Sequence, residues 1–385
     1  MFSEYQGFLN LDQILKDEYD YEFDGDLSKL YEQDFIEVEG NGVGALCWIS
    51  YKGDKYLFKQ VPSFEYNVWG ELISEEFAKR LGVECASYRA CSLGEQKGVI
   101  TKSFLKDRET LILGSEIFQR FLNRHAETEE NLFHEIMKNC YEVPEDYFKL
   151  DAYNQKKYLF HYLNNLEHIW YILNGDVDIS KEEIKKSLQF LETELVFDII
   201  TMQLDRHPNN WGLKRMDDSK KENKCSYEPS CLYDNASSFG VGVPFIEDIV
   251  SGFRGEYFNC LLLKDEERLD RLMYRGAPDL TMSCDNVVDF SSKRKDIGPI
   301  VLNDYLSYTS LQSHSPLVDQ IDSLDTDFFD ECLKSVEENN GIVMQGDVYY
   351  YMVTLFEYNI GKLKNVCNSF KRSSGINEQT VKGRS

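Results

Sequence analysis

The hydrophobic pattern changes its period once along the chain, near residue 105. From Phe35 to Leu105, apolar residues occur in short extended runs such as FIEVEG, GALCWISY and YLFKQV, separated by turns that contain glycine. Beyond that point they recur at the three- and four-residue spacing of amphipathic helices, as in SEIFQRFLNRH and ENLFHEIMKN. The pattern predicts an α+β fold with a small, β-rich first lobe and a larger, mainly helical second lobe.

Within the first lobe, the sequence predicts about five strands and one helix. Apolar residues recur at helical spacing from Trp69 to Leu81, and Gly82 stands where the end of a helix needs a positive φ. Two more extended runs, ASYRACSL and GVITKSFL, flank a GEQK turn and complete the predicted sheet.

In the second lobe, Ser180 and Glu183 form a capping-box pattern that opens a helix running to about Gln203.

Four segments follow from these patterns. The predicted segments are an acidic N-terminal arm at 1–34, the first lobe at 35–105, the helical lobe at 106–370 and a mobile polar tail at 371–385.

Net charge bears on the partners of this chain. Its 385 residues carry a formal charge of -25, with a pI near 4.7. Nucleic acids and anionic lipids bind clustered Lys and Arg, so this charge argues against both partners. No apolar run approaches the ~20 residues of a membrane span, and the N-terminus lacks the pattern of a signal peptide. We expect no membrane span and a cytoplasmic protein.

The ten cysteines are expected to be reduced packing residues. None forms a C-x-x-C pair, and the closest spacings are Cys85 with Cys91 and Cys225 with Cys231. A zinc site at Cys225 and Cys231 is the alternative, but the spacing is wrong for a zinc knuckle and no histidine follows nearby.

Two polar turns carry the residue types that phosphoryl transfer needs. The first is LDRHPNNWGL at 204–213, and the second is CLYDNASSFG at 231–240. Asp205 and Asn210 are separated by four residues, and Asp234 opens the second turn. A kinase uses such residues to orient the acceptor hydroxyl and to hold magnesium on the nucleotide phosphates. We therefore predict Asp205 as catalytic base and Asn210 and Asp234 as magnesium ligands.

Other residues of the first turn are predicted to support it. His207 belongs to this candidate catalytic loop, but together with Arg206 it is expected to be structural rather than an acid or base. Pro208 helps to keep the loop out of a helix, since it has no amide hydrogen. Each motif alone is common: Asp and Asn recur at this spacing by chance, and Asp-Asn is an ordinary turn dipeptide. Their order, and a glycine loop earlier in the chain, strengthen the prediction.

That glycine loop is EGNGVGAL, between two extended runs. Glycines let backbone amides approach phosphate closely, which makes Gly40, Asn41, Gly42, Val43 and Gly44 candidate nucleotide-binding residues.

The next candidates are Lys59 and Glu71. Lys59, in the strand YLFKQV, is the candidate cation for the nucleotide phosphates, and Glu71, near the start of the predicted helix, is its candidate partner. The alternative is that Lys59 is a solvated strand lysine and Glu71 a surface glutamate.

At these residues the chain resembles the HipA-like serine/threonine kinases and, more distantly, the phosphatidylinositol kinases. The matching motifs are Asp205-Arg206-His207, then Asn210, then Leu232-Tyr233-Asp234. GELISEEFAKRLGV is similar to the family helix that carries the glutamate, FIEVEGNGVGAL to its phosphate loop, and VITKSF to the strand before its adenine hinge. The resemblance implies a two-lobed, protein-kinase-like fold that uses ATP and Mg²⁺. It also implies that Lys102, Ser103 and Phe104 lie at the nucleotide.

Two departures from the family pattern affect regulation and partners. The 34 residues before Phe35 are too few for the subdomain that docks an antitoxin in longer members, so we do not expect an antitoxin partner. Glu37 stands where the family carries its regulatory serine, unless it is an ordinary outward-facing strand residue. Any autophosphorylation is then expected in polar segments such as Ser373 and Ser374.

The predicted function is therefore transfer of the γ-phosphoryl group of ATP to a hydroxyl, with Ser or Thr of a protein as the expected acceptor. A lipid or small-molecule kinase is one alternative. A nucleotide-binding pseudokinase that serves as a docking module is the other, although Asp205, Asn210 and Asp234 are all retained.

Overall fold

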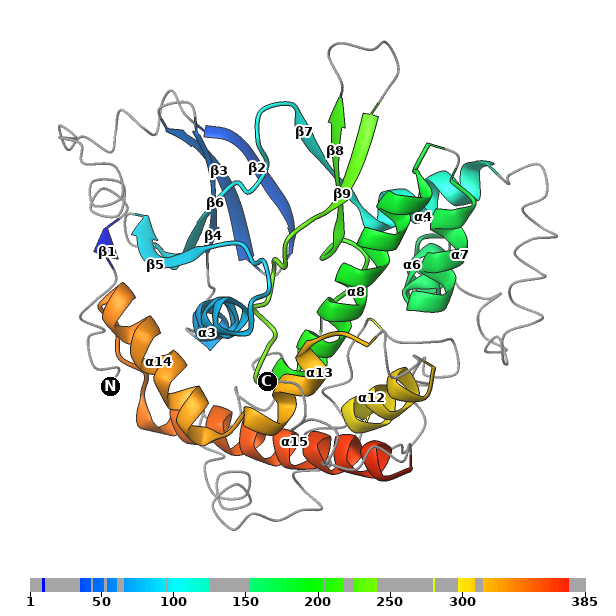
Figure 1. Cartoon of the computed structure of the whole chain (residues 1–385). Coiled ribbons are helices and arrows are strands. Elements are labelled where there is room, and N and C mark those ends of the chain that lie inside the picture. The colour runs from blue at the N-terminus through cyan, green and yellow to red at the C-terminus, as the bar shows by residue number, and fades with distance from the viewer. Residues whose placement is uncertain are drawn as a thin grey trace. The chain divides into compact units, whose positions relative to one another are not determined.

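Figure 1 shows the structure of the chain, a computed structural model. Its contacts divide it into two compact units. Unit 1 comprises Met1–Lys106, Cys231–Leu263 and Leu324–Leu355, and unit 2 comprises Asp107–Ser230, Lys264–Ser323 and Phe356–Ser385. The structure describes residues 9–10, 35–42, 44–51, 54–60, 66–93, 96–124, 152–176, 178–203, 205–217, 225–240, 280, 297–308 and 314–373.

Unit 1 is built on a six-stranded sheet with the order β1-β5-β6-β4-β3-β2. Neighbouring strands are antiparallel, except that β1 runs parallel to β5. The predicted strands are present, and β1 adds a short edge from the predicted N-terminal arm. The strands are β1 (Leu9–Asn10), β2 (Phe35–Gly42), β3 (Gly44–Tyr51), β4 (Asp54–Gln60), β5 (Tyr88–Leu93) and β6 (Gln96–Lys102).

The predicted helix of unit 1 is α3 (Tyr66–Leu81). Its apolar residues are buried, with Ile73 and Phe77 at 0% exposure. Gly82 follows the helix with φ +73°, a conformation that residues with a Cβ rarely adopt. The predicted end of the helix is therefore confirmed.

An aromatic cluster joins α3 to two distant parts of the sequence. The Phe77 ring lies 5.0 Å from that of Phe239 and 5.9 Å from that of Phe329, measured between ring centroids, and all three meet edge to face. Phe329 belongs to α14 (Thr326–Asn340). Edge-to-face packing is favourable for aromatic rings, so the cluster fixes α14 and the end of the 231–240 turn against α3.

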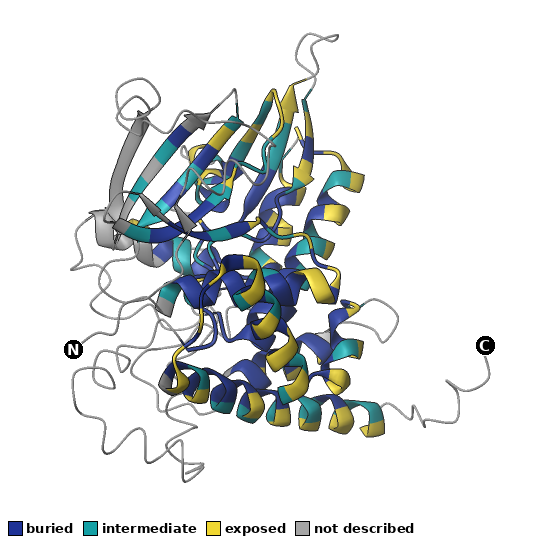
Figure 2. Ribbon diagram, turned by 90° about the vertical axis from the view of Figure 1, so that its left-hand side faces the viewer, coloured by how far each residue is buried: buried dark blue, intermediate teal, exposed yellow. Residues whose placement is uncertain are grey.

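Unit 2 is mainly helical and also contains a three-stranded sheet, β7-β8-β9. The long helix α15 begins in unit 1 and continues through unit 2, and Figure 2 shows that one of its sides is buried and the other exposed. The helices are α4 (Gly114–Arg124), α6 (Ala152–Leu163), α7 (Leu166–Asn174), α8 (Lys181–Thr201), α12 (Ile297–Tyr308), α13 (Leu317–Gln320) with the 3₁₀ turn η4 (Ile321–Ser323), and α15 (Gly346–Ser373). The strands are β7 (Glu109–Leu113), β8 (Gly212–Asp217) and β9 (Cys225–Pro229).

Two local features differ from the sequence prediction. We did not predict β7, because its five residues precede a strongly amphipathic helix and the helical pattern dominated the prediction. Lys371 was expected to begin a mobile tail, but α15 continues to Ser373 and Lys371 pairs with Asp322 at 2.6 Å. The Ser373 hydroxyl donates to the Phe370 carbonyl. Ser374 lies outside the described residues, and the other segment boundaries remain predictions.

The described helices also bear on membrane insertion. None of them combines the length and the apolar character that a transmembrane segment requires.

The predicted capping box opens α8. Ser180 Oγ accepts a hydrogen bond from the Glu183 N–H at 3.3 Å, and Glu183 Oε2 accepts one from the Ser180 N–H at 2.7 Å. The helix ends at Thr201, slightly before the predicted Gln203, because Met202 adopts a left-handed conformation with φ 55°.

Replacing Ser180 with Ala should lower the free energy of unfolding by about 1 kcal/mol, because the first turn of α8 loses a cap. Chemical denaturation measures the change. Ser307→Ala in α12 is the control: Ser307 is an exposed helical serine whose hydroxyl, among the described residues, bonds the preceding turn, so the change there should be smaller. Equal losses in the two variants would contradict the capping role.

Candidate functional site

Lys59 of β4, Glu71 of α3 and Asp234 form an ionic cluster in unit 1. The Lys59 ammonium donates to Glu71 Oε1 at 3.1 Å and to Asp234 Oδ1. The Glu71 side chain is 1% exposed, whereas those of Lys59 and Asp234 are 27% and 38% exposed. Lys59 is therefore not a solvated strand lysine and Glu71 is not a surface glutamate. The roles assigned to these residues remain predictions.

Burial and charge act in opposite directions on this cluster. Burial lowers the pKa of Lys59, but the carboxylates of Glu71 and Asp234 outweigh it and raise that pKa above its usual value. Burial raises the pKa of Glu71, against the opposing effects of Lys59 and of the Asn235 N–H. Both Glu71 oxygens accept hydrogen bonds, which favours the ionised form. The cluster then holds one positive and two negative charges.

The backbone of Asp234 is fixed by two side chains. Asp234 has φ 54°, in the left-handed region that Asp tolerates better than most residues. Its N–H donates to the hydroxyl of Tyr88 at 3.0 Å, and the next N–H, of Asn235, donates to Glu71 Oε2 at 2.7 Å. Tyr88 is buried, so these two bonds orient the Asp234 carboxylate. Tyr88 could not be predicted from the sequence, because a tyrosine in a strand resembles any other core residue.

A close approach of backbones holds the same turn against α3. Leu232 exchanges hydrogen bonds with the chain around Cys85, and the two residues form an isolated parallel bridge. Further along the 231–240 turn, the backbone also approaches α3 closely. A Cβ placed on Gly70 would lie 2.5 Å from the Ala236 carbonyl oxygen. Only glycine at this position allows the 231–240 turn to lie so near the helix.

The predicted phosphate loop lies at the β2–β3 hairpin. The two strands pair antiparallel up to Gly42 opposite Gly44, with an irregularity between Glu39 and Gly42. Val43 and the side chains of β2, including that of Glu37, lie outside the described part of the chain. The nucleotide role of Gly40 to Gly44 and the regulatory role of Glu37 remain predictions.

The residues predicted to lie at the adenine hinge, Lys102, Ser103 and Phe104, contact other residues of unit 1. Lys102 pairs with Asp54 at 2.7 Å, and both side chains are partly exposed. The Ser103 N–H extends the hydrogen bonding of β6 to β4. The Phe104 ring stacks on that of Tyr233, with 5.6 Å between centroids, beside Asp234 in sequence. Their contact with a nucleotide remains a prediction.

Asp205, His207 and Asn210 lie in the loop after α8, in unit 2. The Asp205 side chain is 53% exposed, whereas Asn210 is buried. Asn210 Nδ2 donates to the Asp205 carbonyl at 2.6 Å, and the Asn210 N–H donates to the His207 carbonyl at 2.8 Å. With its amide nitrogen engaged, Asn210 presents Oδ1 as the atom that could bind a metal. His207 Nε2 lies 3.8 Å from Asp205 Oδ1.

Arg206 anchors this loop in the core of unit 2. Its guanidinium is fully buried and donates twice to Asp198 of α8, at 3.0 and 2.9 Å. The same group donates to the Asn210 carbonyl at 3.0 Å. Arg206 therefore ties the start of the D-x-x-x-x-N segment to Asp198 of α8 and holds the end of the segment through the Asn210 carbonyl. This agrees with the supporting role predicted for Arg206.

Sequence analysis missed two further supports of this loop. Asn164, in the turn between α6 and α7, donates to the Arg206 carbonyl at 2.8 Å and accepts from the Trp211 indole N–H at 2.8 Å. A Cβ on Gly114 would lie 2.7 Å from the Pro208 carbonyl oxygen and 2.4 Å from the Trp211 ring. Neither residue carries a motif, and only the fold brings them to the loop.

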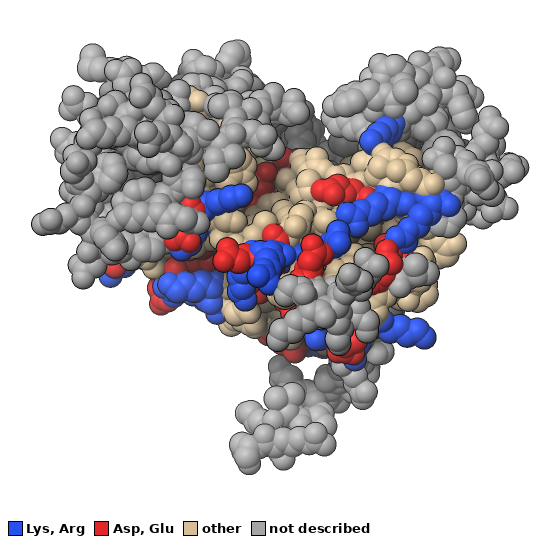
Figure 3. All heavy atoms as spheres, turned by 90° about the horizontal axis from the view of Figure 1, so that it is seen from above, with Lys and Arg blue, Asp and Glu red and all other residues tan. Residues whose placement is uncertain are grey.

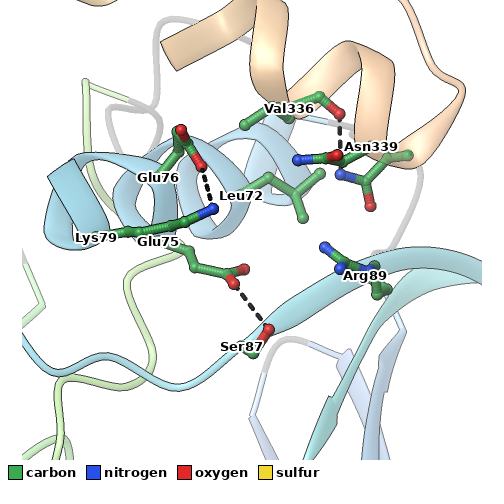
Figure 4. A pocket seen from close by; sticks show the side chains of 9 residues that line it. Leu72, Glu75, Glu76, Lys79, Ser87, Arg89, Val336 and Asn339 are labelled. Carbon is green, nitrogen blue, oxygen red and sulfur yellow. Dashed lines mark hydrogen bonds and ion pairs between the residues drawn. The ribbon is translucent and has the colours of Figure 1, made fainter. Parts of the chain in front are cut away.

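A cavity of about 260 Å³ lies elsewhere in unit 1, among α3, α14 and the start of β5 (Figure 4). Its polar lining is already bonded internally: Glu75 accepts from Ser87 at 2.7 Å, and Glu76 pairs with Lys79 at 3.6 Å. Neither Lys59 nor Asp234 lines it. The cavity is therefore separate from the ionic cluster.

On the face in Figure 3, Lys and Arg lie among Asp and Glu in the described regions.

Among the described residues, no three His, Cys, Asp or Glu side chains gather as a ready-made metal site. Cys225 lies near the Tyr227 hydroxyl and Cys231 is buried, both as free thiols. A magnesium ion held partly by nucleotide phosphates needs only one or two protein ligands.

Comparison with known proteins gives structural matches alone. No family model and no curated protein matches the chain. It is similar to the crystal structure of the Helicobacter pylori proinflammatory kinase CtkA, with TM-score 0.56 and 16% identity, covering 89% of this chain and 96% of that one. It also matches the Shewanella oneidensis MR-1 HipA, HipB and operator DNA complex, with TM-score 0.41 and 12% identity, covering 95% of this chain and 72% of that one.

The match to CtkA shows the fold. A TM-score of 0.41 supports no conclusion, so the match to the HipA complex adds nothing further. The predicted α+β, kinase-like fold is confirmed as a likeness of fold to a solved kinase.

Replacing Gly70 with Ala should destabilise the protein by about 1–3 kcal/mol, because the added methyl group would push the Ala236 carbonyl away from α3. Gly361→Ala is the matched control, since an added Cβ there meets no atom within 4 Å. In that exposed part of α15 the same exchange should stabilise by about 0.5–1 kcal/mol. Denaturant titration of both variants measures the contrast, and stabilisation by Gly70→Ala would contradict the close approach.

Proposed function

We propose that this chain is an ATP-dependent kinase that transfers the γ-phosphoryl group to a hydroxyl acceptor. The cluster of Lys59, Glu71 and Asp234 carries the proposal, because kinases use a strand lysine, a helix glutamate and a metal-binding aspartate in this combination. The likeness of fold to a solved kinase supports it.

The residues fit a role for magnesium. Asp234 offers a partly exposed carboxylate within the ionic cluster, which has an excess of negative charge, and Asn210 offers an amide oxygen. Carboxylate and amide oxygens suit this hard cation. When bound, magnesium would neutralise the charge of the nucleotide phosphates. Lys59 would pair with the phosphates while Glu71 keeps it aimed, and the amides of Gly40 to Gly44 would approach them.

Asp205 is the residue we assign to the acceptor. Its carboxylate is exposed, while the backbone on either side of it is fixed by Arg206 and Asn210. An exposed carboxylate on a fixed backbone suits the task of orienting a hydroxyl and accepting its proton. We propose Ser or Thr of a protein as the acceptor, ATP and Mg²⁺ as cofactors, and the cytoplasm as the location.

Asp205→Asn should lower turnover by about 10²–10⁴-fold while ATP still binds, because the amide cannot accept the proton. Labelled ATP with a lysate as the source of acceptors measures transfer, and calorimetry measures nucleotide binding. Asp217→Asn, at an exposed aspartate that ends β8, is the control. Unchanged transfer in Asp205→Asn would remove the assigned base. Nucleotide binding without transfer in the unmodified protein would favour a docking module instead.

Asp234→Ala should weaken ATP binding in the presence of magnesium and leave binding without magnesium less affected, since the carboxylate acts through the metal. Calorimetric titration with and without magnesium separates the two effects. Asp330→Ala is the control, because Asp330 is an exposed residue of α14 that contacts only the Tyr349 hydroxyl among the bonds described for it. The same magnesium dependence in Asp234→Ala and in the unmodified protein would refute the role.

A further inference from the structure

Three charged side chains meet in the core of unit 2 without water-exposed surface. Arg206 and Asp198 are each 0% exposed, and Glu194 is 1% exposed. Glu194 and Asp198 lie four residues apart on α8, so they share one face of the helix. One guanidinium therefore faces two carboxyl groups in a dry environment.

The two carboxyl groups are bound unequally. Arg206 Nε and Nη2 both donate to Asp198, and Nη1 donates to the Asn210 carbonyl. Glu194 Oε1 lies 3.3 Å from Arg206 Nε, but neither Glu194 oxygen accepts a hydrogen bond from the described residues. Asp198 is thus the anion that the guanidinium satisfies, and Glu194 is left without a donor.

A second buried negative charge would be costly here. An ion taken out of water loses several kcal/mol unless it is paired and hydrogen-bonded, and Arg206 supplies only one positive charge. A proton on Glu194 removes this excess. Burial raises the pKa of Glu194 to about 8, with Arg206 lowering it and Asp198 raising it.

We propose that Glu194 is a neutral carboxylic acid in the folded protein, and that loss of its proton at alkaline pH loosens the 205–210 loop through Arg206. An ionised Glu194 competes with Asp198 for the guanidinium. The guanidinium holds the Asn210 carbonyl, and the Arg206 carbonyl accepts from Asn164, so displacing Arg206 disturbs both bonds. Glu194 is therefore a positioning residue for the proposed kinase, whereas its protonation does not depend on that assignment.

Other groups near α8 have different partners. Glu192 faces the Tyr305 hydroxyl of α12 at 3.3 Å, and Glu183 binds the Tyr227 N–H of β9. Asn359 of α15 donates to the carbonyls at the end of α8. Of the charges in the described regions, those of Arg206 and Asp198 act on the pKa of Glu194.

The first test follows the proton. The folded state holds a proton on Glu194 at pH values where the unfolded chain has lost it, so the contribution of Glu194 to stability is full below the usual glutamate pKa and is lost as pH rises to about 8. Glu194→Gln should remove that part of the fall in thermal midpoint. Glu182→Gln, an exposed glutamate on the same helix, should keep it. In spectra of protein with ¹³C-labelled glutamate carboxyl groups, one resonance should titrate about three or more pH units above the usual range and be missing only from Glu194→Gln.

The second test follows the loop. Hydrogen exchange at the Asn210 and Trp211 amides should lose protection between pH 7 and pH 9 in the unmodified protein, beyond the intrinsic change in rate. In Glu194→Gln, this loss of protection should be smaller by about tenfold or more. A Glu194 carboxyl that titrates in the usual range overturns the proposal, and so does equal loss of protection in both proteins. If the proton and loop results hold but no phosphoryl transfer is found, the proposed function fails and this inference stands.

Discussion

The buried ion pair between Arg206 and Asp198 is the interaction on which the candidate catalytic loop depends. Asp198 lies in the last turn of α8, and Arg206 joins it, across the end of the helix, to the Asn210 carbonyl. Removing one partner of a buried pair leaves an uncompensated charge, which is far worse than losing an exposed contact. The geometry of the loop is therefore tied to the stability of unit 2.

The turn that carries Asp234 is fixed by a different means. Its backbone donates to Tyr88 and Glu71, while Gly70 lets the chain come close to α3. Glu71 thus has two tasks, since one oxygen holds Lys59 and the other holds the turn. The edge-to-face rings of Phe77, with Phe239 and Phe329, extend this attachment to α14.

The sequence predicts local features well and convergent contacts poorly. The helix opened by Ser180 and the end of α3 at Gly82 were predictable, because each depends on residues that are neighbours in the chain. The pairing of Lys59 with Glu71 was predictable only through a motif. Tyr88 and Asn164 were not predictable, because their roles come from hydrogen bonds to residues 146 and 42 positions away. Such contacts leave no periodicity or composition signal.

The two ionic clusters show how burial decides what balances a charge. Lys59 lies between Glu71 and Asp234, and Arg206 between Glu194 and Asp198, so each cation faces two carboxyl groups. In unit 1 the Asp234 carboxylate is 38% exposed, so water and a divalent cation can reach it, and its negative charge can be kept for a metal. In unit 2 both carboxyl groups are sealed from solvent, and a proton is the neutralising species that needs no added volume. The same arrangement of charges therefore leaves a carboxylate that a cation can reach where it is open, and favours a neutral acid where it is closed.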